Sequence, residues 1–130
     1  MPGIKLTLSG EPNPAQANQL VKELTELTSR ILKKLPERTM VMVRYQPKDQ
    51  WFIAGQSLAE SGMNSFRLEI TITEETNTKS EKAAFHKAAF QLLADRLGKL
   101  HRHSNVHIID CPATSYGYGG ETQEWRYFND

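Results

Sequence analysis

The order of predicted elements in this sequence recurs after 65 residues, and that repetition limits the folds open to the chain. Asn13 is placed to cap a helix, and Thr78, 65 residues later, is placed to cap another. Gly55 and Gly120, one in each of two predicted hairpins, are separated by the same distance. A constant offset at two separate points indicates duplication rather than coincidence. We therefore expect a chain built from two copies of one structural unit.

The first copy begins with a strand and a helix. Apolar and polar residues alternate over 4–9, which is the pattern of a half-buried strand. Asn13 supplies a capping side chain and Pro14 suits the first helical position, so we expect a helix from there to about Leu35. A second strand over 40–45 and an aromatic hairpin over 51–55 complete the unit.

The second copy repeats this order. Alternation over 67–73 predicts a strand, and Thr78 with Glu81 matches a capping box that opens a helix. A strand over 106–109 and a glycine-rich hairpin over 116–120 follow. We expect a single domain over 1–130, made of repeat one at about 2–57, a linker at about 58–64, repeat two at about 65–121 and a C-terminal tail at 122–130.

The repeated unit determines the expected fold class. In each repeat a helix crosses over between two strands, so those strands should be parallel and the connection right-handed. Two such tandem β-α-β repeats predict an α+β fold, with a four-stranded mixed sheet and two helices on one face. The other face stays uncovered, and we expect apolar side chains there that neighbouring subunits bury. The alternative is a monomer with a mostly solvated sheet face.

Composition narrows the class of function. The formal net charge is +1 with charges mixed along the chain, which does not favour a nucleic-acid or membrane partner. Cys111, as the single cysteine, cannot form an internal disulfide and fits a reducing compartment. The first residues lack the pattern of a signal peptide, and no apolar stretch approaches a membrane span. We expect a soluble, cytoplasmic protein.

The first repeat resembles 4-oxalocrotonate tautomerase. It begins Pro2-Gly3-Ile4, and its spacing from Pro2 to Trp51, the hairpin aromatic, matches that enzyme without a gap. The second repeat, which ends Tyr116-Gly117-Tyr118-Gly119-Gly120, is similar to another copy of the same unit. The resemblance therefore covers almost the whole chain and points to the fused members of the tautomerase superfamily. It implies a homotrimer of fused chains that isomerises a small molecule without a cofactor or metal.

The resemblance implies that Pro2 is the catalytic base. Removal of Met1 would leave Pro2 with a secondary amine, and amino-terminal pKa values ordinarily lie near 7.7–8.0. An apolar pocket disfavours the charged amine and lowers that pKa, so the neutral amine can accept a proton. Phe66 occupies the matching place in the second repeat and has no free amine. A trimer would therefore hold three proline sites.

The residues that would bind substrate are less close to the family pattern. The two substrate-binding arginines of the family align here with Glu11 or Pro12 and with Met40, so both arginines are missing. Arg38 and Arg44 flank Met40, and either guanidinium could hold a carboxylate at two points. The alternative for each is a solvated or interface arginine.

Other candidates come from the hairpins and the second repeat. Trp51 and Tyr116 both fall on the family's hairpin aromatic and could wall the pocket, although packing at an interface is the alternative. Asn105 takes the arginine position of the second repeat, and His107, two residues on, could hydrogen-bond a substrate oxygen or be structural. Arg126, near the end of the chain, could fold back over the site.

Several other activities are disfavoured. Dehalogenating members of the superfamily have arginines before the second helix, whereas residues 73–77 contain none. The metal-binding residue types near the second strand of repeat two match no ligand spacing, so we expect no metal site; they are His101, His103, His107 and Cys111. The sequence predicts a tautomerase that moves a proton in a small, carboxylate-bearing keto or enol compound. The alternative is a catalytically inert trimeric relative with a binding or structural role.

Overall fold

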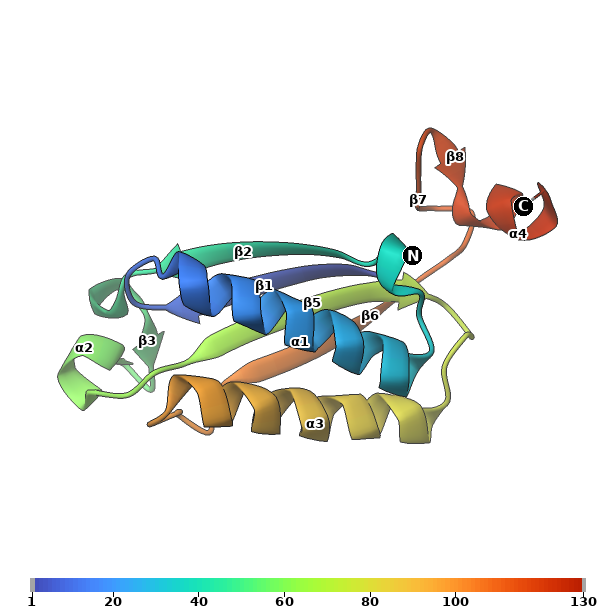
Figure 1. The fold of residues 1–130 in the computed structure, drawn as a ribbon. Coiled ribbons are helices and arrows are strands. Elements are labelled where there is room, and N and C mark those ends of the chain that lie inside the picture. Colours follow the sequence, from blue (N-terminus) through green and yellow to red (C-terminus); the bar gives the residue numbers. More distant parts are fainter. Residues whose placement is uncertain (1, 130) are drawn as a thin grey trace.

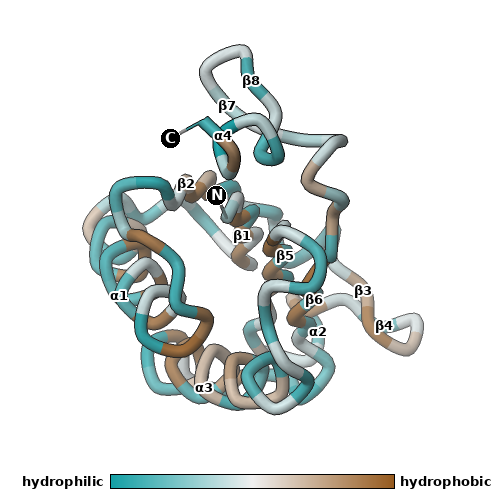
Figure 2. The backbone as a smooth tube through the Cα atoms, turned by 90° about the vertical axis from the view of Figure 1, so that its right-hand side faces the viewer, coloured by the Kyte–Doolittle hydropathy of each residue, from teal (hydrophilic) through white to brown (hydrophobic). Residues whose placement is uncertain are grey.

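The computed structural model describes residues 2–129, and Met1 and Asp130 lie outside the described residues. Two long helices cover one face of a four-stranded sheet (Figure 1). The helices are α1 (Pro14–Leu32) and α3 (Lys79–Leu97), and the strands are β1 (Gly3–Ser9), β2 (Met40–Gln46), β5 (Phe66–Thr73) and β6 (Asn105–Cys111). Figure 2, viewed from a perpendicular direction, separates the helical layer from the sheet layer.

The sheet has the strand order β2-β1-β5-β6. Each repeat contributes a parallel pair, β1 with β2 and β5 with β6, and the two repeats join through antiparallel pairing of β1 with β5. Leu6 lies opposite Leu68 in that central pair. The α+β class, the mixed four-stranded sheet and the placement of both helices on one face are therefore confirmed.

The elements that follow each parallel pair also repeat. The first hairpin pairs β3 (Phe52–Ile53) with β4 (Gln56–Ser57), and the second pairs β7 (Gly117–Tyr118) with β8 (Glu121–Thr122). Each strand of the second hairpin begins 65 residues after its counterpart in the first. The helices α2 (Leu58–Ser61) and α4 (Gln123–Asn129) come next. Both lie in segments expected to be a linker and a tail. Local capping explains them, because Ser57 accepts a hydrogen bond from the Glu60 amide and Thr122 accepts one from the Trp125 amide.

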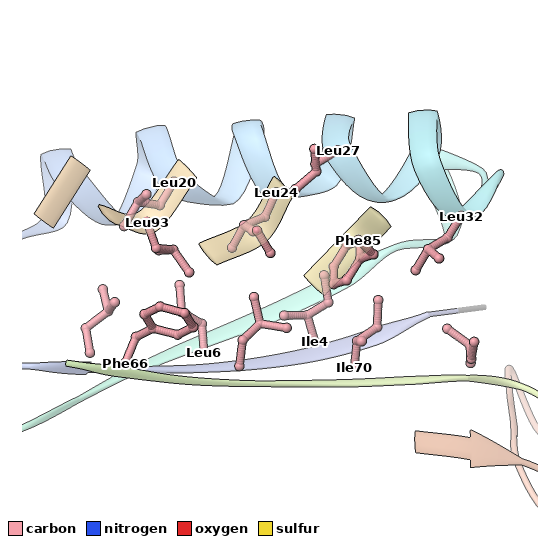
Figure 3. Close-up of a cluster of buried hydrophobic side chains, with 14 residues drawn as sticks. Ile4, Leu6, Leu20, Leu24, Leu27, Leu32, Phe66, Ile70, Phe85 and Leu93 are labelled. Atoms are coloured by element: carbon pink, nitrogen blue, oxygen red, sulfur yellow. The ribbon is translucent and has the colours of Figure 1, made fainter. Parts of the chain in front are cut away.

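The core lies between the helices and the two central strands (Figure 3). Alternate residues of β1 and β5 point toward the helices and are fully or almost fully buried, as in Leu6 and Phe66. The helices contribute Leu20, Leu24 and Phe85, which are also buried. Burial of each such side chain contributes about 1.5–3 kcal/mol, so this layer holds the strands in register.

The uncovered sheet face differs from the expectation. Because β1 and β5 place their apolar residues against the helices, the alternate positions on the uncovered face are polar, as in Lys5, Thr7 and Glu69. Among the described residues of this face, the exposed large apolar side chains lie on the outer strands: Met40 (50% exposed) and Met42 (49%) on β2, and Ile109 (44%) on β6. The expected apolar face is therefore wrong for the central strands of the described sheet.

A capping box fixes the loop between β5 and α3. The Thr78 hydroxyl accepts a hydrogen bond from the Glu81 amide at 3.0 Å, and the Glu81 carboxylate accepts one from the Thr78 amide at 2.8 Å. Thr78→Ala should lower the free energy of unfolding by about 1 kcal/mol, because the orphan amides at the helix start lose their partner. Denaturant unfolding measures this. Ser80→Ala is the control, since the exposed Ser80 side chain forms no hydrogen bond within the described chain; equal effects of the two changes would contradict the prediction.

Candidate functional site

Pro2 is buried at the end of the sheet where β1 begins. Its carbonyl oxygen accepts a hydrogen bond from the Met40 amide at 3.1 Å. On its other side Gly3 pairs with Thr71, so the same antiparallel register places Pro2 next to the last residues of β5. Pro2 therefore lies between the start of β2 and the end of β5.

A cavity of about 400 Å³ lies at this end of the sheet. Its described walls are Arg38, Thr73, Thr76, Ala113, Gln123, Arg126 and Tyr127. Arg38 precedes Met40 by two residues, and Thr73 ends β5, so the cavity lies at the same end of the sheet as Pro2, although Pro2 is not among its described walls. None of these described walls is acidic, and two of them are arginines, which makes the cavity suited to an anion.

Arg38 lies in a 3-10 turn over Pro36–Arg38 and not on a strand. A strand that reached back to Arg38 would place it on the same face as Met40, but β2 begins at Met40. The turn forms because Pro36 is preset for its first position and the Thr39 amide donates to the Pro36 carbonyl at 3.1 Å. Arg38 is half-buried and lines the cavity from this turn.

The second hairpin covers the same end of the sheet. The hydroxyl groups of Tyr116 and Thr73 are hydrogen-bonded, which ties the start of the hairpin to the end of β5. Burial raises the pKa of Tyr116 above its ordinary value, with the hydrogen bond to Thr73 acting in the opposite direction. The phenol is therefore protonated at neutral pH and can donate a hydrogen bond.

Helix α4 carries Arg126 back to this site. The Gln123 amide donates to the Tyr116 carbonyl at 2.8 Å, and this bond fixes α4 against the hairpin. Arg126 donates from Nη2 to the Tyr118 carbonyl at 2.8 Å, and its guanidinium lies 3.8 Å from the centre of the Tyr118 ring. Gly119 permits this approach, because its φ is +65° and a Cβ there would lie 2.6 Å from Arg126 Nη2.

Three of the predicted substrate residues lie at the opposite end of the sheet. Arg44 is four residues beyond Met40 on β2, a distance of about 13 Å along a strand. Arg44, Trp51 and Asn105 line a separate cavity of about 700 Å³. His107 lies between the two ends, exposed on the uncovered face opposite Glu69. Within one chain, the structure thus brings Arg38, Tyr116 and Arg126 to the Pro2 end and leaves the others away from it.

Sequence reasoning did not single out Thr73, Thr76 and Gln123 as walls of the Pro2 cavity. Thr73 and Thr76 lie in the segment 73–77, which lacks the arginines of the dehalogenating members and contains two glutamates, and Gln123 lies in the expected tail. The signal that could have found them is antiparallel pairing of the first and third strands, since it brings the end of β5 next to Pro2.

Within residues 2–129, no group of three or more histidine, cysteine, aspartate or glutamate side chains is arranged to hold a metal ion. His101 instead accepts a hydrogen bond at Nδ1 from the His103 amide at 3.0 Å. No helix in the same range is long and apolar enough to cross a membrane.

Known proteins match this chain in part of its sequence and in its fold. Residues 3–61 match the family of tautomerase enzymes. Native fused 4-OT is 22% identical, with 94% of this chain and 96% of that chain covered at a TM-score of 0.78. The wild-type fused 4-OT Q0, a symmetric trimer, is 17% identical over 94% and 96% of the two chains, with a TM-score of 0.79. Pt0534, inactivated by 2-oxo-3-pentynoate, is 15% identical over 95% and 98%, with a TM-score of 0.83. A search of curated protein sequences returned no match.

These likenesses show that this chain has, over 94% of its length, the two-repeat fold of the fused 4-OT structures. Its first half, residues 3–61, also carries the sequence pattern of the tautomerase enzymes. The resemblance to the fused 4-OT-like members of the tautomerase superfamily, expected from the sequence, is therefore confirmed.

The raised pKa of Tyr116 gives a test of the site's geometry. Because burial disfavours the phenolate, one of the four tyrosines should titrate above the ordinary value of about 10, and Tyr116→Phe should remove that component. A group whose pKa is raised by folding stabilises the fold below its unfolded pKa, so this contribution disappears as pH rises past about 10. Phenolate ultraviolet absorbance measures the titration. Tyr127→Phe, which changes an exposed tyrosine, is the control; loss of the high component in that variant instead would contradict the assignment.

Proposed function

We propose that this protein is a tautomerase that uses the amino-terminal amine of Pro2 as its general base. The observation that carries the proposal is the position of Pro2, buried at the sheet end beside a cavity whose described walls include two arginines and no acidic side chain. The proposal requires that Met1, which lies outside the described residues, be removed. The fold shared with fused 4-OT supports it.

Proton transfer follows from the state of the amine. Burial of Pro2 disfavours the charged form of a free amine there and lowers its pKa, which favours the neutral form that can accept a proton. The neutral nitrogen removes a proton from the carbon next to a substrate carbonyl, and the electron pair of that C–H bond moves toward the carbonyl oxygen to give an enolate. The protonated amine then returns the proton to another position of the conjugated system. The proton taken from the substrate is thus returned to it, and the neutral amine of Pro2 is regenerated.

The cavity walls suit a small carboxylate as substrate. Arg38 and Arg126 would hold the carboxylate, because a guanidinium donates two parallel hydrogen bonds to it. Tyr116, protonated at neutral pH, would donate to the oxygen on which negative charge develops. Each role is a positioning or charge-stabilising one, and Pro2 alone moves the proton.

The catalytically inert relative remains the second candidate. It is favoured by the two family arginine positions, which are occupied here by Glu11 or Pro12 and by Met40. In that case the cavity beside Pro2 would bind a carboxylate without converting it. Kinetics of a Pro2 variant distinguish the two functions.

Pro2→Ala should lower kcat/KM for the enol form of phenylpyruvate by about 10²–10⁴-fold, since the variant replaces a rigid secondary amine by a mobile primary one. Ultraviolet absorbance follows the enol, and circular dichroism checks that the fold is retained. The matched control is Pro12→Ala, an exposed proline beyond the other end of β1. Unchanged kinetics in Pro2→Ala would assign the base to another residue, and no turnover in the parent protein across keto and enol substrates would favour the inert relative.

We also propose that the protein is a homotrimer, as fused 4-OT Q0 is. Exposed Met40 and Met42 on the uncovered sheet face are suited to burial by neighbouring chains. Sedimentation should give about three times the chain mass of 14.8 kDa. Met42→Asp should shift the protein toward monomer, whereas Lys22→Asp on the outer side of α1 should not. A monomeric parent protein would contradict this assembly.

A further inference from the structure

The larger cavity at the end of the sheet opposite Pro2 is not used by the proposed reaction. It has a volume of about 700 Å³, within the range of about 300–1,000 Å³ that small-molecule sites occupy. Its described walls come from all four strands of the sheet or the turns beside them and from the first hairpin. We propose that this cavity is a second, non-catalytic binding site for an aromatic carboxylate.

A row of paired residues forms the polar side of this cavity. Thr7 on β1 pairs with Arg44 on β2 and with Arg67 on β5, and Arg67 pairs in turn with Asn105 on β6. All four residues line the cavity. Because adjacent strands lie about 4.8 Å apart, the backbones of the two arginines are about 10 Å apart, with the Thr7 hydroxyl between them. This spacing allows both long side chains to reach one bound carboxylate.

The charge of the row is positive. Arg44 forms no hydrogen bond or ion pair within the described chain, so its guanidinium is left for a partner from outside the chain, either a ligand or, in the proposed trimer, a neighbouring chain. Arg67 donates from Nε to Glu69 at 2.8 Å, which leaves its terminal nitrogens for other partners. Glu69 lies outside the described walls of this cavity, and none of those walls is acidic. A carboxylate would therefore meet two guanidinium groups without a competing anion in the walls.

The apolar side of the cavity comes from the first hairpin. Trp51, Phe52 and Ile53 line it, and Phe52 is 62% exposed in the described chain. The Leu58 amide donates to the Trp51 carbonyl at 2.9 Å and fixes the hairpin against α2. An aromatic ring on the ligand would stack on or pack against these side chains. Together with the arginines, this wall selects a carboxylate that carries an aromatic body.

The two ends of the sheet have diverged. The Pro2 end has a corresponding row with the two repeats exchanged. Its members, Ile109, Thr71, Gly3 and Met40, pair in the same way as Arg44, Thr7, Arg67 and Asn105. That row has no charged side chain, and it lies at the Pro2 end. The cationic row lies instead at the end where buried Phe66 replaces the proline. One end thus keeps the base, and the other keeps a carboxylate-binding row without a base.

Phenylacetate is a suitable probe because it has an aromatic ring and a carboxylate but no keto group to isomerise. The two tryptophans report on different ends of the molecule, since Trp51 lines this cavity and Trp125 lies in α4 near the Pro2 end. In NMR titrations of the assembled protein, phenylacetate should shift the indole N–H signal of Trp51, assigned with Trp51→Phe. Phenylacetamide, the neutral analogue, should not.

Variants locate the interaction. Arg44→Gln should raise the Kd of phenylacetate, read from the Trp51 signal, by about 10–100-fold, because a hydrogen bond to a charged group is lost. Arg67→Gln should weaken binding in the same direction, while Arg38→Gln, at the other cavity, should change that Kd by less than about twofold. Pro2→Ala should leave it unchanged, so failure of the proposed catalysis and failure of this site are distinguishable.

Three results would overturn the proposal. The first is no shift of the Trp51 signal at millimolar phenylacetate, and the second is an equal shift with phenylacetamide. The third is dissociation of the assembly by Arg44→Gln, since Arg44 would then hold a neighbouring chain rather than a ligand.

Discussion

Antiparallel pairing of β1 with β5 is the interaction on which the rest of the molecule depends. It joins two β-α-β repeats that each lack a complete core, and it aligns the apolar residues of both central strands, such as Leu6 and Leu68, beneath both helices. The same pairing brings the end of one repeat to the beginning of the other. The second hairpin therefore lies at the Pro2 end, and the first hairpin lies at the end that begins with Phe66.

Much of the fold could be predicted from the sequence because its determinants are local. Strand alternation, the Asn13 cap and the Thr78 capping box each act over a few residues, and the structure contains the corresponding elements close to their expected bounds. Duplication then reduced the topology to one repeated unit. The short helices α2 and α4 were missed, since helices of 4 and 7 residues carry little periodic signal and depend on caps beside them.

The site was harder to predict because it depends on pairing between repeats. Alignment of the repeats placed Trp51 and Tyr116 at equivalent positions, but it could not assign each hairpin to an end of the sheet. The register between β1 and β5 makes that assignment, and it separates Tyr116 at the Pro2 end from Trp51 at the other. Arg38 reaches the Pro2 cavity from a 3-10 turn, a position that strand geometry alone did not give.

Duplication also explains why the two ends can carry different chemistry. Once two units are fused, each end of the sheet can change without altering its counterpart, and here one end has the proline while the other has two arginines in a cross-strand row. The first of these ends is the proposed catalytic one, where a free amine at Pro2 would act as the base. The most direct measurement compares turnover of the phenylpyruvate enol by protein that retains Met1 and protein that lacks it, each verified by intact mass. The account predicts activity in proportion to the fraction of chains without Met1, since an amide nitrogen is not a base at neutral pH; equal activity of the two forms would contradict it.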